Sequence, residues 1–418
     1  MSKKLLIEGV WVILTNILAF VASFIVISIT ASKLSVAGYG SLALIFTLQA
    51  FFNIILFGSI NNGVQRFSPV SKELEKFRSF FSSTLKIGLI FSILVIILFF
   101  IFSLIFLLLN KSNWIYPLGL AIFISIFLGL SEFIVSIIIS IRNRKLVFIF
   151  KLIDSLFKIL LLIYYKIESY LDILEIYLIS SVLYYLILLG NYRKTVDLKN
   201  FVSLSSYEKY WIKKMYLYSM PFILWGIFGW FQQSSIKWSM DFFLDRDSVG
   251  NFNALIQISY TPVLLIYGTV SSFLTPIYFQ KIKINNVDSK SKNLLNKIIS
   301  FSFISVIIVI IGSFILYSIG GQLLTLVFPL EYLVILDYMP VSFLAAGLFA
   351  IGSFITTIPF SLGKSEAVLS SSIAGSIIGI LSALIFVYFF GFMGGVMALL
   401  THGFSHLTLT YFRVKKML

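Results

Sequence analysis

Cysteine is absent from this chain of 418 residues, and charged residues are scarce. Without a thiol the chain cannot form a disulfide, use a catalytic thiolate or bind a metal through cysteine. Asp, Glu, Lys and Arg make up 12% of the residues, whereas 59% are hydrophobic and 44 are phenylalanine. A soluble domain has no need of that much apolar surface, so the composition predicts a protein embedded in lipid.

Sequence motifs of ATP-dependent enzymes are also missing, since the chain has neither a Walker-type phosphate loop nor the residue set of a kinase. Its predicted outer loops are too short to fold into a catalytic domain. These absences disfavour an enzyme with an outer catalytic domain, and energy from ATP, if used, would need another polypeptide. His402 and His406 lie one turn apart in the last predicted helix, but no third ligand is near them in sequence, which disfavours a metal site. No cofactor is expected, and coupling to H⁺ or Na⁺ is left open.

Apolar runs recur along the whole chain, and each is long enough for a bilayer crossing of about 20 residues. Counting these runs between charged or turn-like breaks predicts about twelve transmembrane helices, which makes the fold class an all-α polytopic membrane protein. The predicted helices cover Val10–Thr30, Tyr39–Ile60, Leu85–Leu109, Ile115–Ile141, Val147–Tyr165, Leu171–Gly190, Leu217–Phe243, Gly250–Thr275, Asn296–Ile319, Tyr332–Ile358, Ala367–Phe390 and Phe392–Phe412. The resulting organisation is a six-helix bundle over residues 1–190, a basic linker over 191–215 and a second six-helix bundle over 216–418.

Lys and Arg, which total 32, are concentrated on one side of this predicted topology. Most of them fall in segments that share a side with the N-terminus. Positive residues are retained on the cytoplasmic side of a membrane. Both termini and the basic linker are therefore predicted to be cytoplasmic. The basic residues lie in short connections rather than on one soluble face, so nucleic acid is not expected as a partner.

Two stretches of the chain match each other at a constant offset of 210 residues. Residues 34–40 align with residues 244–250, and each stretch is a polar turn that ends in Gly before an apolar helix. The register continues without a gap, so that Phe57-Gly58 falls on Tyr267-Gly268. Because six helices separate the copies, both enter the membrane in the same direction, which predicts parallel repeats. A general likeness in composition between two polytopic halves is the alternative explanation.

The stretch from Leu34 to Gly40, Phe57-Gly58, Arg66 and the number of helices together resemble the polysaccharide transporters of the MOP exporter superfamily, whose members include Wzx-type O-antigen flippases. The resemblance covers the whole length. It implies a V-shaped pair of bundles that moves an undecaprenyl-diphosphate-linked oligosaccharide from the inner to the outer leaflet of a bacterial cytoplasmic membrane. The chain departs from many such relatives at Lys237, which stands where they have an acidic residue.

The seventh predicted helix carries a polar stripe that is expected to face the cleft between the two bundles. Lys237 on this stripe could hold the diphosphate of the substrate, while Gln232 and Gln233 could form hydrogen bonds with sugar hydroxyls. The alternative is that Lys237 and Asp241, four residues apart, form an ion pair with each other near the outer interface.

A second group of candidate substrate-binding residues lies where the second predicted helix ends on the cytoplasmic side. Arg66 is the cation of this group, and a guanidinium suits phosphate oxygens. Asn61 and Gln65 lie beside it, and Asn16 of the first helix is a further candidate. The alternative is that Arg66 only anchors the helix on the positive side of the membrane.

Ion coupling has its own candidates, namely Glu132, Asp154, Lys158 and Asp241. The first three lie at similar depth in two adjacent predicted helices, so they could form a buried structural ion-pair network. The alternative is that Glu132 or Asp154 is a protonatable coupling site, because burial favours the neutral form of a carboxyl group.

The function predicted from these features is a flippase for a lipid-linked oligosaccharide. Its expected partners are that substrate, membrane lipid, and a polysaccharide polymerase or glycosyltransferases that could dock on the linker. One alternative is an ion-coupled multidrug exporter of the same superfamily, which the cationic Arg66 and Lys237 disfavour. Another is a membrane-embedded polysaccharide polymerase or a scaffold for a biosynthetic complex. The polymerase is disfavoured by the lack of a sizeable outer loop.

Overall fold

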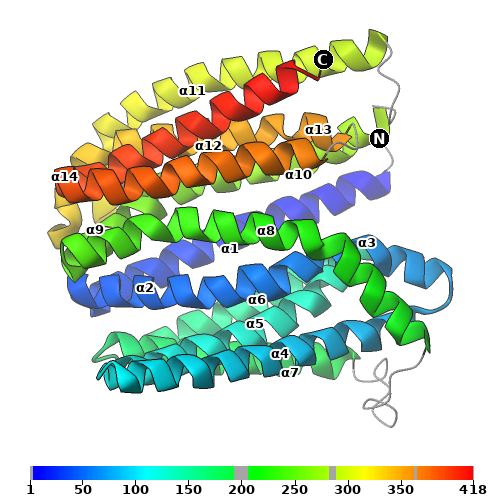
Figure 1. Ribbon diagram of the computed structural model, residues 1–418, viewed down its shortest axis with the longest axis horizontal. Coiled ribbons are helices and arrows are strands. Elements are labelled where there is room, and N and C mark those ends of the chain that lie inside the picture. The colour runs from blue at the N-terminus through cyan, green and yellow to red at the C-terminus, as the bar shows by residue number, and fades with distance from the viewer. Residues whose placement is uncertain (1–2, 193–205, 282–288, 362–364, 418) are drawn as a thin grey trace. The chain divides into compact units, whose positions relative to one another are not determined.

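A computed structural model of the chain describes residues 3–192, 206–281, 289–361 and 365–417 (Figure 1). Every secondary-structure element in these ranges is a helix, as the sequence predicts. The helices of the first half are α1 (Lys3–Lys33), α2 (Val36–Phe52), the π-helical segment η1 (Asn53–Gly58), α3 (Ser59–Glu73), α4 (Phe77–Leu108), the short η2 (Ser112–Trp114), α5 (Ile115–Ser140), α6 (Arg144–Tyr164) and α7 (Tyr170–Tyr192).

The second half begins with α8, which starts inside the predicted linker and is longer than the predicted seventh helix. The elements are α8 (Ser206–Phe243), α9 (Arg246–Leu255), the π-helical η4 (Ile256–Tyr260), α10 (Thr261–Lys281), α11 (Ser289–Val327), the 3₁₀-helical η5 (Leu330–Tyr338), α12 (Met339–Ile355), α13 (Thr357–Ser361) and α14 (Ser365–Lys415). Within α14, Gly391 has φ 60° and ψ −135°, which kinks the chain and divides α14 into two consecutive helices.

Membrane spans can be counted from these helices. In the described part of the chain, 9 helical segments are long and apolar enough to cross a membrane. Two further helices, α6 and α8, have suitable lengths but carry more polar and charged residues. The segment Val368–Lys415 is one of the 9, and its kink at Gly391 makes it two spans. The structure therefore has about the twelve transmembrane helices that the sequence predicts.

The chain divides into two compact units that each contain residues from both halves of the sequence. Unit 1 consists of Met1–Lys33 and Ile45–Trp230, and unit 2 consists of Leu34–Leu44 and Phe231–Leu418. The first turns of α2 thus belong to unit 2, and the first part of α8 belongs to unit 1. Each of these two helices passes from one unit into the other along its own length.

Unit 1 has an aromatic core in which small residues allow close helix packing. Phe57 of η1 is fully buried, and a Cβ atom on Gly129 of α5 would lie 2.2 Å from its ring. A Cβ atom on Gly63 of α3 would lie 2.9 Å from the main-chain oxygen of Met215 in α8. These glycines let α5 and α8 approach the η1–α3 segment more closely than any larger residue would permit.

Unit 2 contains a reciprocal contact between the first turns of α2 and α9. A Cβ atom on Gly40 would lie 2.1 Å from the main-chain oxygen of Arg246, and a Cβ atom on Gly250 would lie 2.2 Å from the main-chain oxygen of Val36. Adding 210 to Val36 and Gly40 gives Arg246 and Gly250, so the two close approaches are the same contact seen from either repeat. A contact in which i meets j and j meets i is the signature of a local two-fold axis. The geometry supports the repeat found in the sequence.

Candidate functional site

The end of α8 in unit 2 presents the cation that the sequence singles out. The Lys237 ammonium group donates a hydrogen bond of 2.7 Å to Oδ1 of Asn253 on α9. Lys237 is half-buried, and Asn253 is buried. Asn253 lies one turn beyond Gly250, so the close approach of α2 and α9 at that glycine also fixes the position of the amide.

The predicted alternative, an ion pair between Lys237 and Asp241, is not what the structure contains. Asp241 instead pairs with the guanidinium of Arg246 at the start of α9. Nη1 of Arg246 also donates to the Ser41 hydroxyl at 3.4 Å, and the Asp245 carboxylate caps α9 by accepting from the Ser248 amide at 2.7 Å. The turn between α8 and α9 therefore holds Asp241 away from Lys237. The suggested coupling role of Asp241 stays a prediction.

The two glutamines predicted to bind sugar hydroxyls have different surroundings. Gln233 is exposed on α8, whereas Gln232 is buried with 4% of its surface accessible. Gln232 packs on Gly379 of α14, which also contacts His402. Gln233 therefore keeps its amide available to a ligand, while Gln232 points into the interior of unit 2.

The ion pairs of the buried lysines set Lys237 apart. Among the lysines whose burial is described, four are not exposed: Lys86, Lys151, Lys158 and Lys237. Three of them contact a carboxylate, with distances of 2.9 Å for Lys86–Glu208, 3.1 Å for Lys151–Glu132 and 2.9 Å for Lys158–Asp154. Lys237 alone in this set of four bonds to a neutral amide. Lys237 is thus the lysine of this set whose charge is not paired with a carboxylate.

The candidate coupling residues of unit 1 form two separate pairs rather than one predicted group. Glu132 of α5 pairs with Lys151 of α6, and Asp154 of α6 pairs with Lys158 one turn along the same helix. Both pairs take their lysine from α6, and the similar depth of Glu132, Asp154 and Lys158 stays a prediction. Oδ1 of Asp154 is buried without a hydrogen-bond partner in the described part of the chain.

The predicted cytoplasmic group lies mainly on α3 in unit 1. Nε2 of Gln65 donates to the Ser136 hydroxyl on α5 at 3.4 Å. Arg66 is exposed and forms no hydrogen bond or ion pair with described residues. Oδ1 of Asn61 is buried and has no hydrogen-bond partner among these residues, and Asn16 is exposed on α1. The structure thus brings Asn61, Gln65 and Arg66 together on one short helix, and their role in substrate binding stays a prediction.

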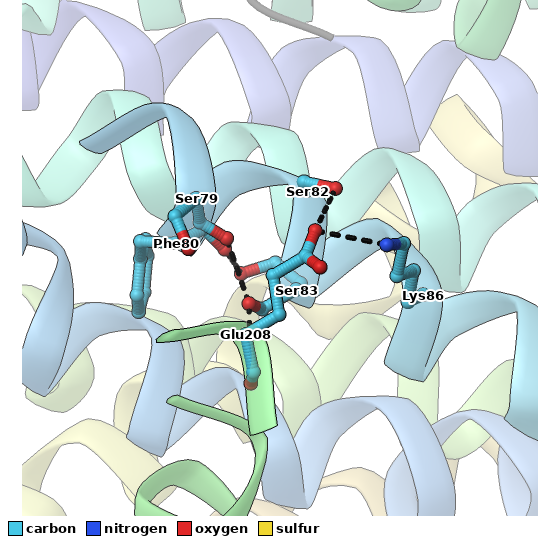
Figure 2. Close-up of polar contacts among 7 residues, drawn as sticks. Ser79, Phe80, Ser82, Ser83, Lys86 and Glu208 are labelled. Atoms are coloured by element: carbon cyan, nitrogen blue, oxygen red, sulfur yellow. Dashed lines mark hydrogen bonds and ion pairs between the residues drawn. The ribbon is translucent and has the colours of Figure 1, made fainter. Parts of the chain in front are cut away.

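Sequence reasoning missed a buried charge network between α4 and α8. Figure 2 shows Ser82 and Lys86 of α4 directed at the carboxylate of Glu208, which is in the first turn of α8. Oε1 of Glu208 accepts hydrogen bonds of 2.6 Å from the Ser82 hydroxyl and 2.9 Å from the Lys86 ammonium group. The side chains of Lys86 and Glu208 are only 7% and 8% exposed. Glu208 lies in the predicted linker, but the apolar spacing of Trp211 and Met215 could have indicated a packed helix there.

The sequence of residues 5–282 matches the family described as "Polysaccharide biosynthesis protein". No curated protein matches the chain significantly.

Solved structures with the same fold cover nearly the whole chain at low sequence identity. An inward-facing MATE family multidrug resistance transporter of the MOP superfamily is 14% identical with a TM-score of 0.70, and the match covers 95% of this chain and 94% of that one. The lipid II flippase MurJ, in an inward closed conformation, is 18% identical with a TM-score of 0.67, covering 98% and 87%. A MOP superfamily transporter from Pyrococcus furiosus, described as having a binding pocket of reversed polarity, is 14% identical with a TM-score of 0.64, covering 98% and 96%. These likenesses confirm the predicted MOP-type fold.

Proposed function

We propose, from the premise that this chain belongs to the polysaccharide biosynthesis protein family, that it is a flippase for an undecaprenyl-diphosphate-linked oligosaccharide. The chain is a multi-pass membrane protein with a transporter fold. The proposal adds the substrate, the bacterial cytoplasmic membrane and the orientation with both termini in the cytoplasm. The observation that carries it is the half-buried Lys237, whose hydrogen-bond partner is an amide rather than a carboxylate.

Lys237 favours an anionic ligand because a charge held in a lipid-embedded helix is costly, by about 2.5–3.5 kcal/mol at a helix centre. A nearby carboxylate normally offsets that cost, as Glu132, Asp154 and Glu208 do for the other lysines that are not exposed. The bond to Asn253 orients the ammonium group but does not neutralise it. A diphosphate is the fixed anionic part of a polyprenyl-diphosphate substrate, and its oxygens accept charge-assisted hydrogen bonds from lysine.

Further groups suit the remaining parts of such a substrate. The exposed guanidinium of Arg66 can bind phosphate oxygens with two parallel hydrogen bonds. The exposed amide of Gln233, one turn before Lys237 on α8, can bond to sugar hydroxyls. The lipid tail of the substrate needs no pocket because the bilayer itself solvates it. No covalent step is required, so the chain is proposed to act as a transporter and not as an enzyme.

Multidrug export is the second candidate, since a MATE family multidrug transporter has the same fold. Exporters of cationic drugs require acidic or aromatic surfaces. A half-buried lysine without a carboxylate partner repels such drugs, so the charge of Lys237 favours the anionic substrate.

Neutralising Lys237 is expected to reduce translocation of a lipid-linked glycan by about tenfold or more, the effect of losing one charge-assisted hydrogen bond. The assay uses liposomes with a fluorescent undecaprenyl-diphosphate oligosaccharide, whose arrival in the outer leaflet is scored by an added glycosidase. Lys237→Met removes the charge at similar length, and Lys237→Arg retains it. Arg66→Ala is expected to weaken translocation in the same assay.

Lys111→Met is the matched control, because Lys111 is an exposed lysine outside the helices. It should leave the rate unchanged. Equal translocation rates for wild type, Lys237→Met and Lys111→Met would show that the charge of Lys237 has no role in translocation. Failure of the wild-type protein to move any of several lipid-linked glycans, together with export of a cationic dye, would replace the flippase by a drug exporter.

A further inference from the structure

Two histidines on the second part of α14 form a buried pair inside unit 2. His402 and His406 are 3% and 5% exposed, and their ring centroids are 6.1 Å apart. The ring of Phe349 on α12 lies 5.1 Å from His402 and 4.8 Å from His406. Oγ of Ser353, also on α12, is 3.3 Å from Nε2 of His406. These imidazoles account for both histidines in the chain.

Glycines on the neighbouring helices make room for the two rings. A Cβ atom on Gly352 of α12 would lie 2.8 Å from Cδ2 of His406, and one on Gly379 of α14 would lie 3.1 Å from Cδ2 of His402. The same Cβ atom on Gly379 would lie 2.9 Å from Cγ of Gln232 on α8. Residues of α12, α14 and α8 therefore form the cradle that surrounds the two rings.

The pair retains unused capacity to bind a proton. Nδ1 of His402 is buried and has no hydrogen-bond partner in the described part of the chain. A neutral imidazole has one nitrogen that can accept a proton, and histidine is the side chain that changes charge near neutral pH. Burial disfavours a charged ring, so this open nitrogen can accept a proton only in a conformation that exposes the pair to water or to an anion.

Charged groups on the elements packed against α14 do not compensate the pair. Helices α12 and α13 carry no charged residue. Lys237 bonds to Asn253, while Asp241 and Arg246 form an ion pair with each other. One further charged residue, Asp247, is in the first turn of α9. The charged residues of α14 are Glu366, whose side chain lies outside the described part, Lys415 in the last turn, and Arg413, which donates a hydrogen bond of 2.8 Å to Ser370.

We infer that His402 and His406 bind a proton whose movement across the membrane drives the transport cycle. This inference rests on the proposed transport function. The carboxylates considered for coupling are less suited, because Glu132, Asp154 and Asp241 each already pair with a cation. A proton added to one of them would leave that cation without its partner. The imidazole pair has no such cation, and its charge can change with a single proton.

Proton binding at this pair changes the stability of the packing around it. Two neutral rings fit the apolar cradle of Phe349 and the glycines. A protonated ring gains some attraction to the Phe349 face but must reach water or an anion, because a buried charge without a partner is unstable. Protonation therefore favours a conformation in which α12 and α14 separate. Gln232 of α8, the helix that carries Lys237, lies beside the same glycine of α14 as His402 does.

Nitrogen-15 NMR of the full chain tests the inference directly, because all histidine signals come from these two rings once any affinity tag has been removed. The protein is labelled with ¹⁵N-histidine, placed in lipid nanodiscs and titrated from pH 8 to pH 5. The expected result is that at least one imidazole becomes protonated in this range. Rings that both remain neutral to pH 5, or that respond to added Zn²⁺ and not to pH, would overturn the proton site.

A transport measurement separates this inference from the proposed function. In the liposome assay, an imposed pH gradient is expected to change the wild-type rate about tenfold, which corresponds to a change of about 1.4 kcal/mol in the activation free energy. The double variant His402→Gln and His406→Gln should lose that dependence, while Ser370→Ala, at the Arg413 contact, should keep it. A wild-type translocation rate that does not change with the pH gradient would reject the proton-coupling site but would still support the flippase. Protonation of the rings without any translocation would reject the flippase.

Discussion

Alanine in place of Gly40 or Gly250 is expected to destabilise the protein by about 1–3 kcal/mol or more, the cost of overpacking a tight interface. Each added Cβ atom would lie 2.1–2.2 Å from a main-chain oxygen, which cannot rotate away as a side chain can. Helices α2 and α9 would have to move apart. The change is measured as the midpoint of thermal unfolding, followed by tryptophan fluorescence of the detergent-solubilised protein.

Two other helical glycines provide the controls for this prediction. Gly229 in α8 and Gly268 in α10 have no atom within 4 Å of an added Cβ. Alanine at either position should be neutral or slightly stabilising, since alanine is the better helix former by roughly 0.5–1 kcal/mol. The two-fold relation also requires that Gly40→Ala and Gly250→Ala have similar costs. A large cost for one and none for the other would contradict the equivalence of the two contacts.

The repeat is visible in the sequence because the close contact between α2 and α9 requires a glycine shortly after the turn in each repeat. The structure keeps the register, since α1 ends at Lys33 and α8 ends 210 residues later at Phe243. The π-helical segments do not follow it, because η1 begins at Asn53 and η4 at Ile256. A π-helical turn depends on local packing in each unit, which the repeat pattern does not specify.

Helix ends are less predictable than helix number. An apolar run reports only the part of a helix that crosses lipid, so the pattern predicts that the seventh helix begins at Leu217. The structure begins α8 at Ser206, because Trp211 and Met215 are buried in the core of unit 1. Burial against protein, rather than lipid, accounts for those extra turns.

Lys237 can be identified as a candidate because a cation inside an apolar helix stands out in any sequence. Its partner cannot, because Asp241 lies at helical spacing on the same helix while Asn253 lies on α9. The outcome depends on Arg246, which pairs with Asp241 across the α8–α9 turn. The fold of a turn thus decides which of two nearby groups contacts a charge.

Removing either partner of the Lys86–Glu208 pair is expected to cost about 3–5 kcal/mol, because the remaining charge would stay buried without its counterion. Lys86→Met leaves the Glu208 carboxylate with the Ser82 hydroxyl as its neutral donor, and Glu208→Gln leaves an ammonium group facing an amide. The lower stability should appear as a lower midpoint of thermal unfolding. The first turns of α8 are expected to detach from α4, which should appear as faster proteolysis of these turns.

The double variant Lys86→Met and Glu208→Gln distinguishes a lost ion pair from a general disturbance of the core. With both charges removed, the new amide oxygen can still accept from the Ser82 hydroxyl, so the double change should cost less than either single change. Lys166→Met breaks an ion pair whose side chains are 87% and 70% exposed, and it should have no measurable effect. Costs that simply add in the double variant would show that Lys86 and Glu208 do not interact. A double variant that recovers stability would establish that a buried charge pair holds the start of α8 to unit 1, in a segment that the sequence pattern predicts to be a linker.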